Sequence, residues 1–295
     1  MKKSKKFVVA GLVLLAAITG LLALTGCKTD VDTSSPQQEQ PGDTDNGNND
    51  NDASVITTGD PAAFITEITA AGTYTLVATK ECTDTAAIKD ALRSLESRQP
   101  DARIHLNLSQ SGITSIGNSA FEGCSSLASV KIPSSVTSIG TFAFSRCSSL
   151  ARVEIPSSVI SIGTFVFDGC SSLASVTFEE GSRLGIIGDY AFRGCSSLAS
   201  VEIPSSVIRI EQCAFSACRS LASVKIPSSV TSIGNDAFLG CFKLSTVKVE
   251  AKTPPSLGTN VFSNTGLKIQ VPRDSVKDYK IAEDWSAYKI EAITP

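Results

Sequence analysis

The sequence is poor in the side chains that most enzymes use for proton transfer and metal binding. It has one histidine (His105), one tryptophan and one methionine in 295 residues. A single histidine excludes histidine-based catalytic triads and metal sites that need two histidines. The sequence also has no phosphate-binding loop, no dinucleotide-binding glycine motif and no Cys-x-x-Cys pair. We therefore expect no catalytic residues, no metal site and no cofactor, and we interpret His105 as a structural residue of a strand.

The first 27 residues have the pattern of an export signal. "MKKSKK" supplies four lysines, and the apolar run that follows ends at Cys27. A run of about 20 apolar residues is also long enough for an uncleaved transmembrane helix. However, the ending Leu-Thr-Gly-Cys resembles the bacterial lipobox, which implies cleavage before Cys27 and acylation of that residue. Because more than one acyl chain holds a protein stably at a membrane, we expect residues 1–26 to be a lipoprotein signal peptide and Cys27 to be the anchor.

Residues 27–58 are predicted to form the lipidated end and a disordered acidic tether. The segment includes "QQEQPGDTDNGNNDND" and has almost no large apolar side chains, so it cannot bury enough surface to fold. A flexible chain of this length has an r.m.s. reach of roughly 30 Å. Removing the four signal-peptide lysines changes the formal net charge from −3 to −7, which disfavours binding to nucleic acids.

From Cys124 onward the sequence repeats with a period of about 23 residues. Within each copy, a Val-x-Ile alternation predicts a short strand that ends at a proline. Ser-Ile-Gly predicts a tight bend, and Ala-Phe marks a short helical or irregular return. Stacked copies bury their apolar residues as ladders and pair their strands about 4.8 Å apart in a parallel sheet. The copies begin at Cys124, Cys147, Cys170, Cys195 and Cys218, with a divergent one at Cys241 and a degenerate earlier unit over residues 101–123.

The repeat resembles that of the BspA-like, or treponemal-type, leucine-rich repeat family over roughly residues 101–264. The shared unit reads Cys-x-x-Leu-x-x-Val-x-Ile-Pro-x-x-Val-x-x-Ile-Gly-x-x-Ala-Phe. The resemblance implies an α/β fold: a leucine-rich repeat solenoid with a curved parallel β-sheet and a short helical or irregular convex side. One unit departs from the pattern, because residues 176–192 carry a loop that is two residues longer. We favour a tolerated bulge there over a ligand contact.

Two flanking segments are predicted to cap the solenoid with mixed α and β structure. In the N-terminal cap, residues 59–100, we expect a strand at 72–80 and a helix that begins near Thr83 or Asp84; another strand follows at 102–109. In the C-terminal cap, residues 265–295, we expect a strand at 265–272 and a helix at 273–290. Trp285 and Tyr288 should fold back over the last coil, and the family resemblance supports such a segment.

The six repeat cysteines should form a ladder with a spacing of about 5 Å, which is within disulfide range. Each occupies a core position of its coil, so we expect buried, reduced thiols that act as small apolar side chains. A linear ladder cannot supply the tetrahedral cage of a zinc site. Cys82 and Cys213 stand outside the ladder, and the sequence leaves their pairing open.

Ligand binding must use positions at which the repeats differ. On the predicted strand, two outward columns give a mixed-charge surface of mostly small residues. In this surface Lys131 with Glu154, and Glu202 with Lys225, have the alternative of simply pairing with each other across strands. The charged candidates are Lys131, Arg152, Glu154, Glu202, Lys225 and Lys248.

A second variable column precedes the Ala-Phe pair. It reads Ser119, Phe142, Phe165, Tyr190, Cys213 and Asp236. Aromatic clusters are common interface anchors, so Phe142, Phe165 and Tyr190 are candidate ligand-binding residues. The alternative is that the three rings pack on one another or into the convex side.

These observations predict a lipoprotein of the bacterial cell envelope, in the outer membrane or on the cell surface, whose solenoid binds a protein or another macromolecule. Members of the BspA-like family have been linked to attachment to host matrix proteins, host cells or other bacteria, so the resemblance implies adhesion. The alternative is a structural envelope protein that associates with copies of itself. We expect neither an enzyme nor a nucleic-acid-binding protein.

Overall fold

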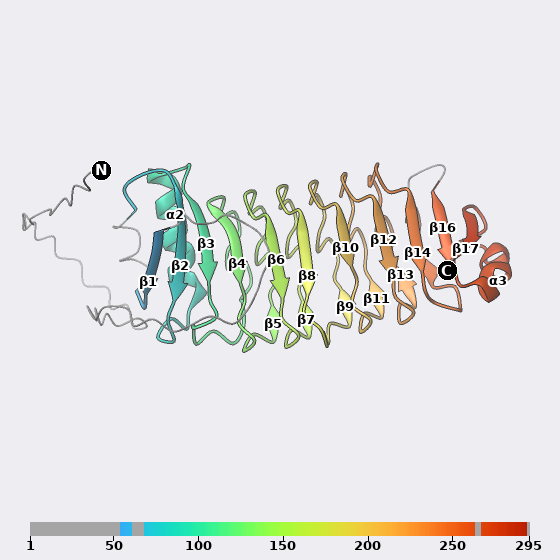
Figure 1. Ribbon diagram of the computed structural model, residues 1–295, viewed down its shortest axis with the longest axis horizontal. Helices are drawn as coiled ribbons and strands as arrows, with labels where there is room; N and C mark the ends of the chain where they lie inside the picture. Colours follow the sequence, from blue (N-terminus) through green and yellow to red (C-terminus); the bar gives the residue numbers. More distant parts are fainter. Residues whose placement is uncertain (1–53, 61–67, 263–266, 294–295) are drawn as a thin grey trace, which may run out of the picture.

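The protein is a solenoid of parallel strands that extends from β1 at one end to β17 at the other (Figure 1). The computed structural model describes residues 54–60, 68–262 and 267–293. The predicted signal peptide, Cys27 and the tether up to residue 53 lie outside the described residues. None of the helices within the described ranges is long and apolar enough to cross a membrane.

Each coil contributes one longer strand to the main sheet. The strands pair in parallel, with Val130, Val153 and Val176 in one buried row, as the repeat predicts. The main sheet has two parts, β1-β2-β3-β4-β6-β8 and β10-β12-β14-β16-β17. The strands are β1 (Ser54–Thr58), β2 (Thr73–Ala78), β3 (Arg103–Asn107), β4 (Leu127–Lys131), β6 (Arg152–Ile155), β8 (Ser175–Phe178), β10 (Ser200–Glu202), β12 (Ser223–Ile226), β14 (Thr246–Val249), β16 (Lys268–Val271) and β17 (Lys289–Ala292).

A second, shorter strand follows in most coils, at the Ser-Ile-Gly segment where the sequence predicted only a bend. These strands form the narrow sheets β5-β7 and β15-β13-β11-β9. The glycine is needed for close approach of neighbouring coils, because a Cβ on Gly163 would lie 2.5 Å from the backbone nitrogen of Thr141. The short strands are β5 (Ser138–Ile139), β7 (Ser161–Ile162), β9 (Ile186–Ile187), β11 (Arg209–Ile210), β13 (Ser232–Ile233) and β15 (Ser256–Leu257).

Two further ladders run through the interior, beside the rows of buried aliphatic side chains. One consists of stacked phenylalanine rings, with neighbouring centroids such as those of Phe144 and Phe167 5.4 Å apart. The other is the cysteine ladder. From Cys147 onward each of its thiols donates a hydrogen bond to a phenylalanine carbonyl of the preceding coil; Cys170 Sγ lies 3.0 Å from Phe144 O. The ladder cysteines are buried and free, which confirms the prediction of reduced thiols. Burial raises the pKa of Cys170 to about 12.

The N-terminal cap continues the main sheet instead of forming a separate lid. Helix α2 (Thr85–Arg98) begins after Asp84, whose Oδ1 accepts a hydrogen bond of 2.8 Å from the backbone N–H of Ala86. The predicted tether extends too far, because Ser54–Thr58 form strand β1 and pair with β2. The sequence "SVITT" is rich in β-branched residues, which favour a strand.

The C-terminal cap contains less helix than predicted. A 3₁₀ turn, η1 (Arg273–Ser275), leads into α3 (Val276–Ile281), and the backbone then becomes extended at Ala282. The prediction of a helix over residues 273–290 is therefore wrong beyond Ile281, and Lys289 begins strand β17. Trp285 does fold back over the last coil as expected, because its Nε1 donates a 2.7 Å hydrogen bond to Pro255 O.

Candidate functional site

The outward face of the main sheet, which we call the strand face, is the first candidate binding surface. The register places Lys131 opposite Glu154 and Glu202 opposite Lys225, with Lys248 next in the same column. Arg152 lies in the other outward column, between Ser129 and Ser175. The candidate residues therefore share one face of the solenoid. They are divided between the two parts of the sheet, a division that the sequence does not reveal.

The predicted cross-strand ion pairs do not form. Among the described residues, Lys131, Arg152, Glu154 and Glu202 make no ion pair, although opposite charges face each other in the register. In the second part of the sheet, Lys225 and Lys248 share one partner instead, a glutamate beyond β14. Glu250 Oε1 lies 3.2 Å from Lys225 Nζ and 3.8 Å from Lys248 Nζ. Unpaired charge is thus concentrated on the strand face between β4 and β10.

Two adjoining hollows lie on this part of the strand face. The first, of about 770 Å³, is bordered by Lys131, Arg152 and Glu154. The second, of about 550 Å³, lies between β8 and β10 and shares Ser175 and Thr177 with the first. A ligand on this face therefore meets charged side chains without an ion pair in the described part of the chain, at the edges of these hollows.

His105 takes part in a side-chain hydrogen bond on the strand face. Its Nδ1 lies 2.6 Å from the hydroxyl of Ser129 on the adjacent strand. The residue is part of β3, as the structural interpretation predicts.

The second candidate surface is the aromatic column formed by Phe142, Phe165 and Tyr190. Neighbouring ring centroids lie 4.8 Å and 4.4 Å apart, with interplanar angles of 10° and 5°. The alternative that the rings pack on one another is therefore confirmed, and all three side chains remain half-buried. Stacking occupies the ring faces inside the column, so a ligand would meet mainly ring edges.

All three aromatic residues have left-handed backbone conformations. Their φ angles are 58° for Phe142, 59° for Phe165 and 57° for Tyr190. Such angles are strained for bulky residues and are better tolerated by asparagine and aspartate. The same position is left-handed in the other coils, and Asp236 and Asn260 occupy it in two of them. Those two residues were the sequence signal for this conformation, which our sequence reasoning missed.

Arg193 and Asp168 complete the aromatic column, and sequence reasoning missed both. The Arg193 Cζ atom lies 5.3 Å from the ring centroid of Phe165 and 5.1 Å from that of Tyr190. Its Nε and Nη2 donate hydrogen bonds of 2.7 and 3.0 Å to the carboxylate of Asp168. The neighbouring Cys213 raises the pKa of Tyr190. These contacts give the column an internal structural role.

The described ranges contain no group of three or more histidine, cysteine, aspartate or glutamate side chains placed to hold a metal ion. All the predicted candidate ligand-binding residues lie on the strand face or in the aromatic column.

A family model for the BspA type leucine rich repeat region matches residues 104–184 and 179–280, in six copies. These matches cover more than half of the chain. The chain belongs to this family. BspA type leucine-rich repeat solenoids generally serve as scaffolds for protein–protein interaction.

The solved structures similar to this BspA type protein include the following three. A leucine-rich repeat protein of T. pallidum is 31% identical over 60% of this chain and 89% of its own, with a TM-score of 0.46. A leucine rich cell surface protein of Faecalibacterium prausnitzii is 24% identical over 59% of each chain, with a TM-score of 0.40. A leucine-rich repeat protein of Bacteroides ovatus is 24% identical over 64% of this chain and 60% of its own, with a TM-score of 0.37. The match thus spans less than two thirds of the Faecalibacterium and Bacteroides proteins. No curated protein matches the chain.

Proposed function

We propose that this BspA type protein is a lipoprotein, anchored in the bacterial cell envelope through acylated Cys27 and displayed at the outer membrane or cell surface. There it binds proteins and promotes adhesion to host matrix, host cells or other bacteria. The lipobox-like ending at Cys27 and the acidic residues before β1 support the anchor. The Faecalibacterium protein, described as a cell surface protein, supports the location.

The observation that carries the binding role is the unpaired charge of the strand face between β4 and β10. A partner that pairs with Lys131, Arg152 and Glu154 breaks no internal ion pair of the solenoid. Charge complementarity of this kind speeds association and selects among partners. Since both signs are present on a solenoid scaffold, a protein ligand fits this surface better than a nucleic acid, and the proposed role is binding rather than catalysis.

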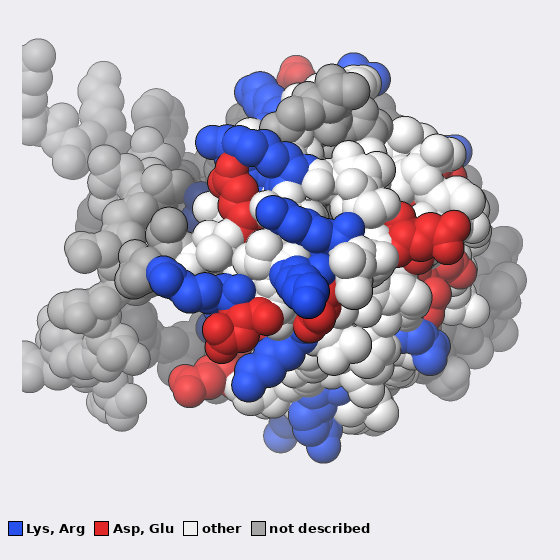
Figure 2. Space-filling view, turned by 90° about the vertical axis from the view of Figure 1, so that its right-hand side faces the viewer, with Lys and Arg blue, Asp and Glu red and all other residues white. Residues whose placement is uncertain are grey.

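Self-association into an envelope layer has less support. Lysine, arginine, aspartate and glutamate side chains of both signs are spread over the C-terminal end of the solenoid (Figure 2). On the last strand, Lys289 pairs with Glu291. Charged side chains at an open sheet end disfavour pairing with another chain, so this end is poorly suited to stacking on a second copy.

Binding can be tested by titrating immobilised host matrix proteins with residues 28–295. We expect the triple variant Lys131→Gln, Arg152→Gln, Glu154→Gln to bind at least tenfold more weakly to any matrix protein that the wild type binds. The double variant Lys225→Gln, Lys248→Gln is the matched control, because those lysines already have an internal partner, and it should retain wild-type affinity. If the triple variant binds with wild-type affinity, the strand face is not the binding surface.

Display can be tested separately by adding protease to intact cells. Digestion of the solenoid in intact cells, and release of a Cys27→Ser variant from the membrane fraction, are the expected results. A protein that resists protease until the cells are broken cannot be an adhesin. Sedimentation of residues 28–295 tests the self-association alternative, for which a strict monomer would be contrary evidence.

A further inference from the structure

The second hollow of the strand face exists because one coil is longer than the others. Its extra loop leans onto the preceding coil: Glu179 Oε2 accepts hydrogen bonds of 2.9 Å from Ser157 N and 3.2 Å from Ser157 Oγ. Arg183 Nη2 also donates a 3.3 Å hydrogen bond to Ser158 O. Strands β8 and β10 lie side by side, but the ladder that joins other neighbouring main strands is interrupted between them (Figure 1). The hollow of about 550 Å³ lies at this interruption.

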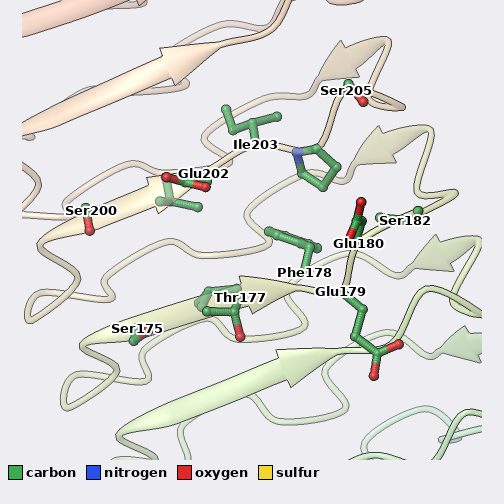
Figure 3. Close-up of a pocket in the computed structure, with 14 residues that line it drawn as sticks. Ser175, Thr177, Phe178, Glu179, Glu180, Ser182, Ser200, Glu202, Ile203 and Ser205 are labelled. Atoms are coloured by element: carbon green, nitrogen blue, oxygen red, sulfur yellow. The ribbon is translucent and has the colours of Figure 1, made fainter. Parts of the chain in front are cut away.

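The hollow has an apolar floor and an acidic rim. Figure 3 shows Phe178 at the end of β8 and Ile203 directly after β10, with Glu202 on β10 and Glu180 on the extra loop. Glu179 turns away toward the preceding coil, consistent with its hydrogen bonds to Ser157. Phe178 is half-buried and Ile203 is only 7% exposed, so the floor offers apolar contact instead of open water.

The charge of the hollow is of one sign. Its lining includes Glu179, Glu180 and Glu202 but no lysine or arginine. Within the described part of the chain, neither Glu180 nor Glu202 makes an ion pair. The lysine opposite Glu202 in the register, Lys225, is directed to Glu250 at 3.2 Å. Two exposed carboxylates therefore stand beside an aromatic ring without an internal cation.

We propose that this hollow binds an arginine or lysine side chain of a partner protein. The aliphatic stem of such a side chain packs on Phe178 and Ile203, while its cationic end donates hydrogen bonds to Glu202 and Glu180. A cation near the face of an aromatic ring gains further attraction, and charge-assisted hydrogen bonds to carboxylates are stronger than neutral ones. This inference rests on the proposed function, since it specifies what kind of residue a protein ligand presents to the strand face.

The test uses two blocked amino acids of nearly equal shape, N-acetyl-arginine amide and its uncharged analogue N-acetyl-citrulline amide, in NMR titrations of residues 28–295. We expect the arginine probe to shift the signals of Thr177, Phe178 and Ile203. The citrulline probe should bind about tenfold more weakly, which corresponds to the loss of roughly one charge-assisted hydrogen bond. N-acetyl-lysine amide should behave like the arginine probe.

Variants locate the effect. Glu202→Gln and Glu180→Gln should each weaken binding of the arginine probe severalfold, whereas Glu122→Gln, which lines neither hollow, should leave it unchanged. Equal affinities for arginine and citrulline, shifts confined to other parts of the solenoid, or an unchanged Glu202→Gln variant would each overturn the proposal. If the wild type binds a matrix protein and the Glu202→Gln variant binds it equally well, the proposal that the hollow takes up a cationic side chain is refuted, and the proposed function stands. If the protein in intact cells is protected from protease, the adhesion role is refuted, but the result of the probe titration still decides whether the hollow binds a cationic side chain.

Discussion

Replacing Phe165 by asparagine tests whether the stabilisation from ring stacking exceeds the backbone strain at this position of the aromatic column. The change removes the stacks on Phe142 and Tyr190 at 4.8 and 4.4 Å, and the contact with Arg193 at 5.3 Å. Two stacks contribute roughly 1–3 kcal/mol together, and the cation–π contact adds about 0.5–1 kcal/mol. The lost burial of a half-buried ring costs about 1 kcal/mol more.

Asparagine also relieves part of the left-handed strain at φ 59°, which is worth about 1–2 kcal/mol. We therefore expect Phe165→Asn to lower the free energy of unfolding by about 2 kcal/mol. Phe142→Asn removes only one stack and should lower it less. Cys213→Asn is the matched control, because it occupies the same left-handed position without a ring and should be neutral or stabilising.

Urea denaturation of residues 28–295, followed by circular dichroism, measures these differences. If Phe165→Asn is more stable than the wild type, stacking does not offset the strain and the structural interpretation of the column is wrong. The column would then carry a cost that folding does not recover, a property of functional positions. In that case the titration with matrix proteins should be repeated with this variant.

Three further predictions concern the interior. In folded residues 28–295, iodoacetamide at pH 8 should label only the half-buried Cys213. After denaturation it should label all eight cysteines of this segment, Cys213 included, as counted by mass spectrometry. Labelling of Cys170 in the folded protein would contradict the buried ladder. Burial raises the pKa of Cys124 and Cys170 to about 12, whereas thiols in the unfolded chain ionise near pH 8.5. Unfolding therefore releases protons at high pH, and the melting temperature should fall from about pH 9 to about pH 12; a flat profile would be inconsistent with this. Gly163→Ala should lower the free energy of unfolding by about 1–3 kcal/mol, because the added Cβ would clash with the backbone nitrogen of Thr141. At Gly117 an added Cβ has no neighbouring atom within 4 Å, so the Gly117→Ala variant should unfold at the same urea concentration as the wild type.

The repeat made the main sheet predictable. A fixed spacing of apolar residues determines which residues of neighbouring coils come into register, so Val130 and Val153 could be paired from the sequence. The cap at Asp84 and the burial of Trp285 were also predictable, because each depends on a local residue preference. The two-residue strands such as β5 were not, since two residues are too few to show an alternation.

The charges on the strand face were placed correctly, but their partners were not. Lys225 lies opposite Glu202 in the register and nevertheless pairs with Glu250. A long lysine side chain reaches several carboxylates at nearly equal cost, and side-chain spacing does not decide among them. Likewise, the extra residues near Glu179 were visible in the sequence, whereas the interruption of the sheet depends on the direction in which that loop leans.

The interruption between β8 and β10 also bears on how the protein unfolds. In a solenoid each coil is stabilised mainly by its neighbours. A junction with fewer contacts therefore reduces the cooperativity of unfolding between the coils on its two sides. The main strands from β1 to β8 share one hydrogen-bond ladder, and the main strands from β10 to β17 share another. The two halves can therefore open at different denaturant concentrations, with the phenylalanine pair Phe167 and Phe192, 5.3 Å apart, among the contacts that still couple them. Backbone hydrogen bonds such as Phe167 N to Ala191 O also cross this junction, so the main sheet is interrupted where the opposite wall of the solenoid is continuous.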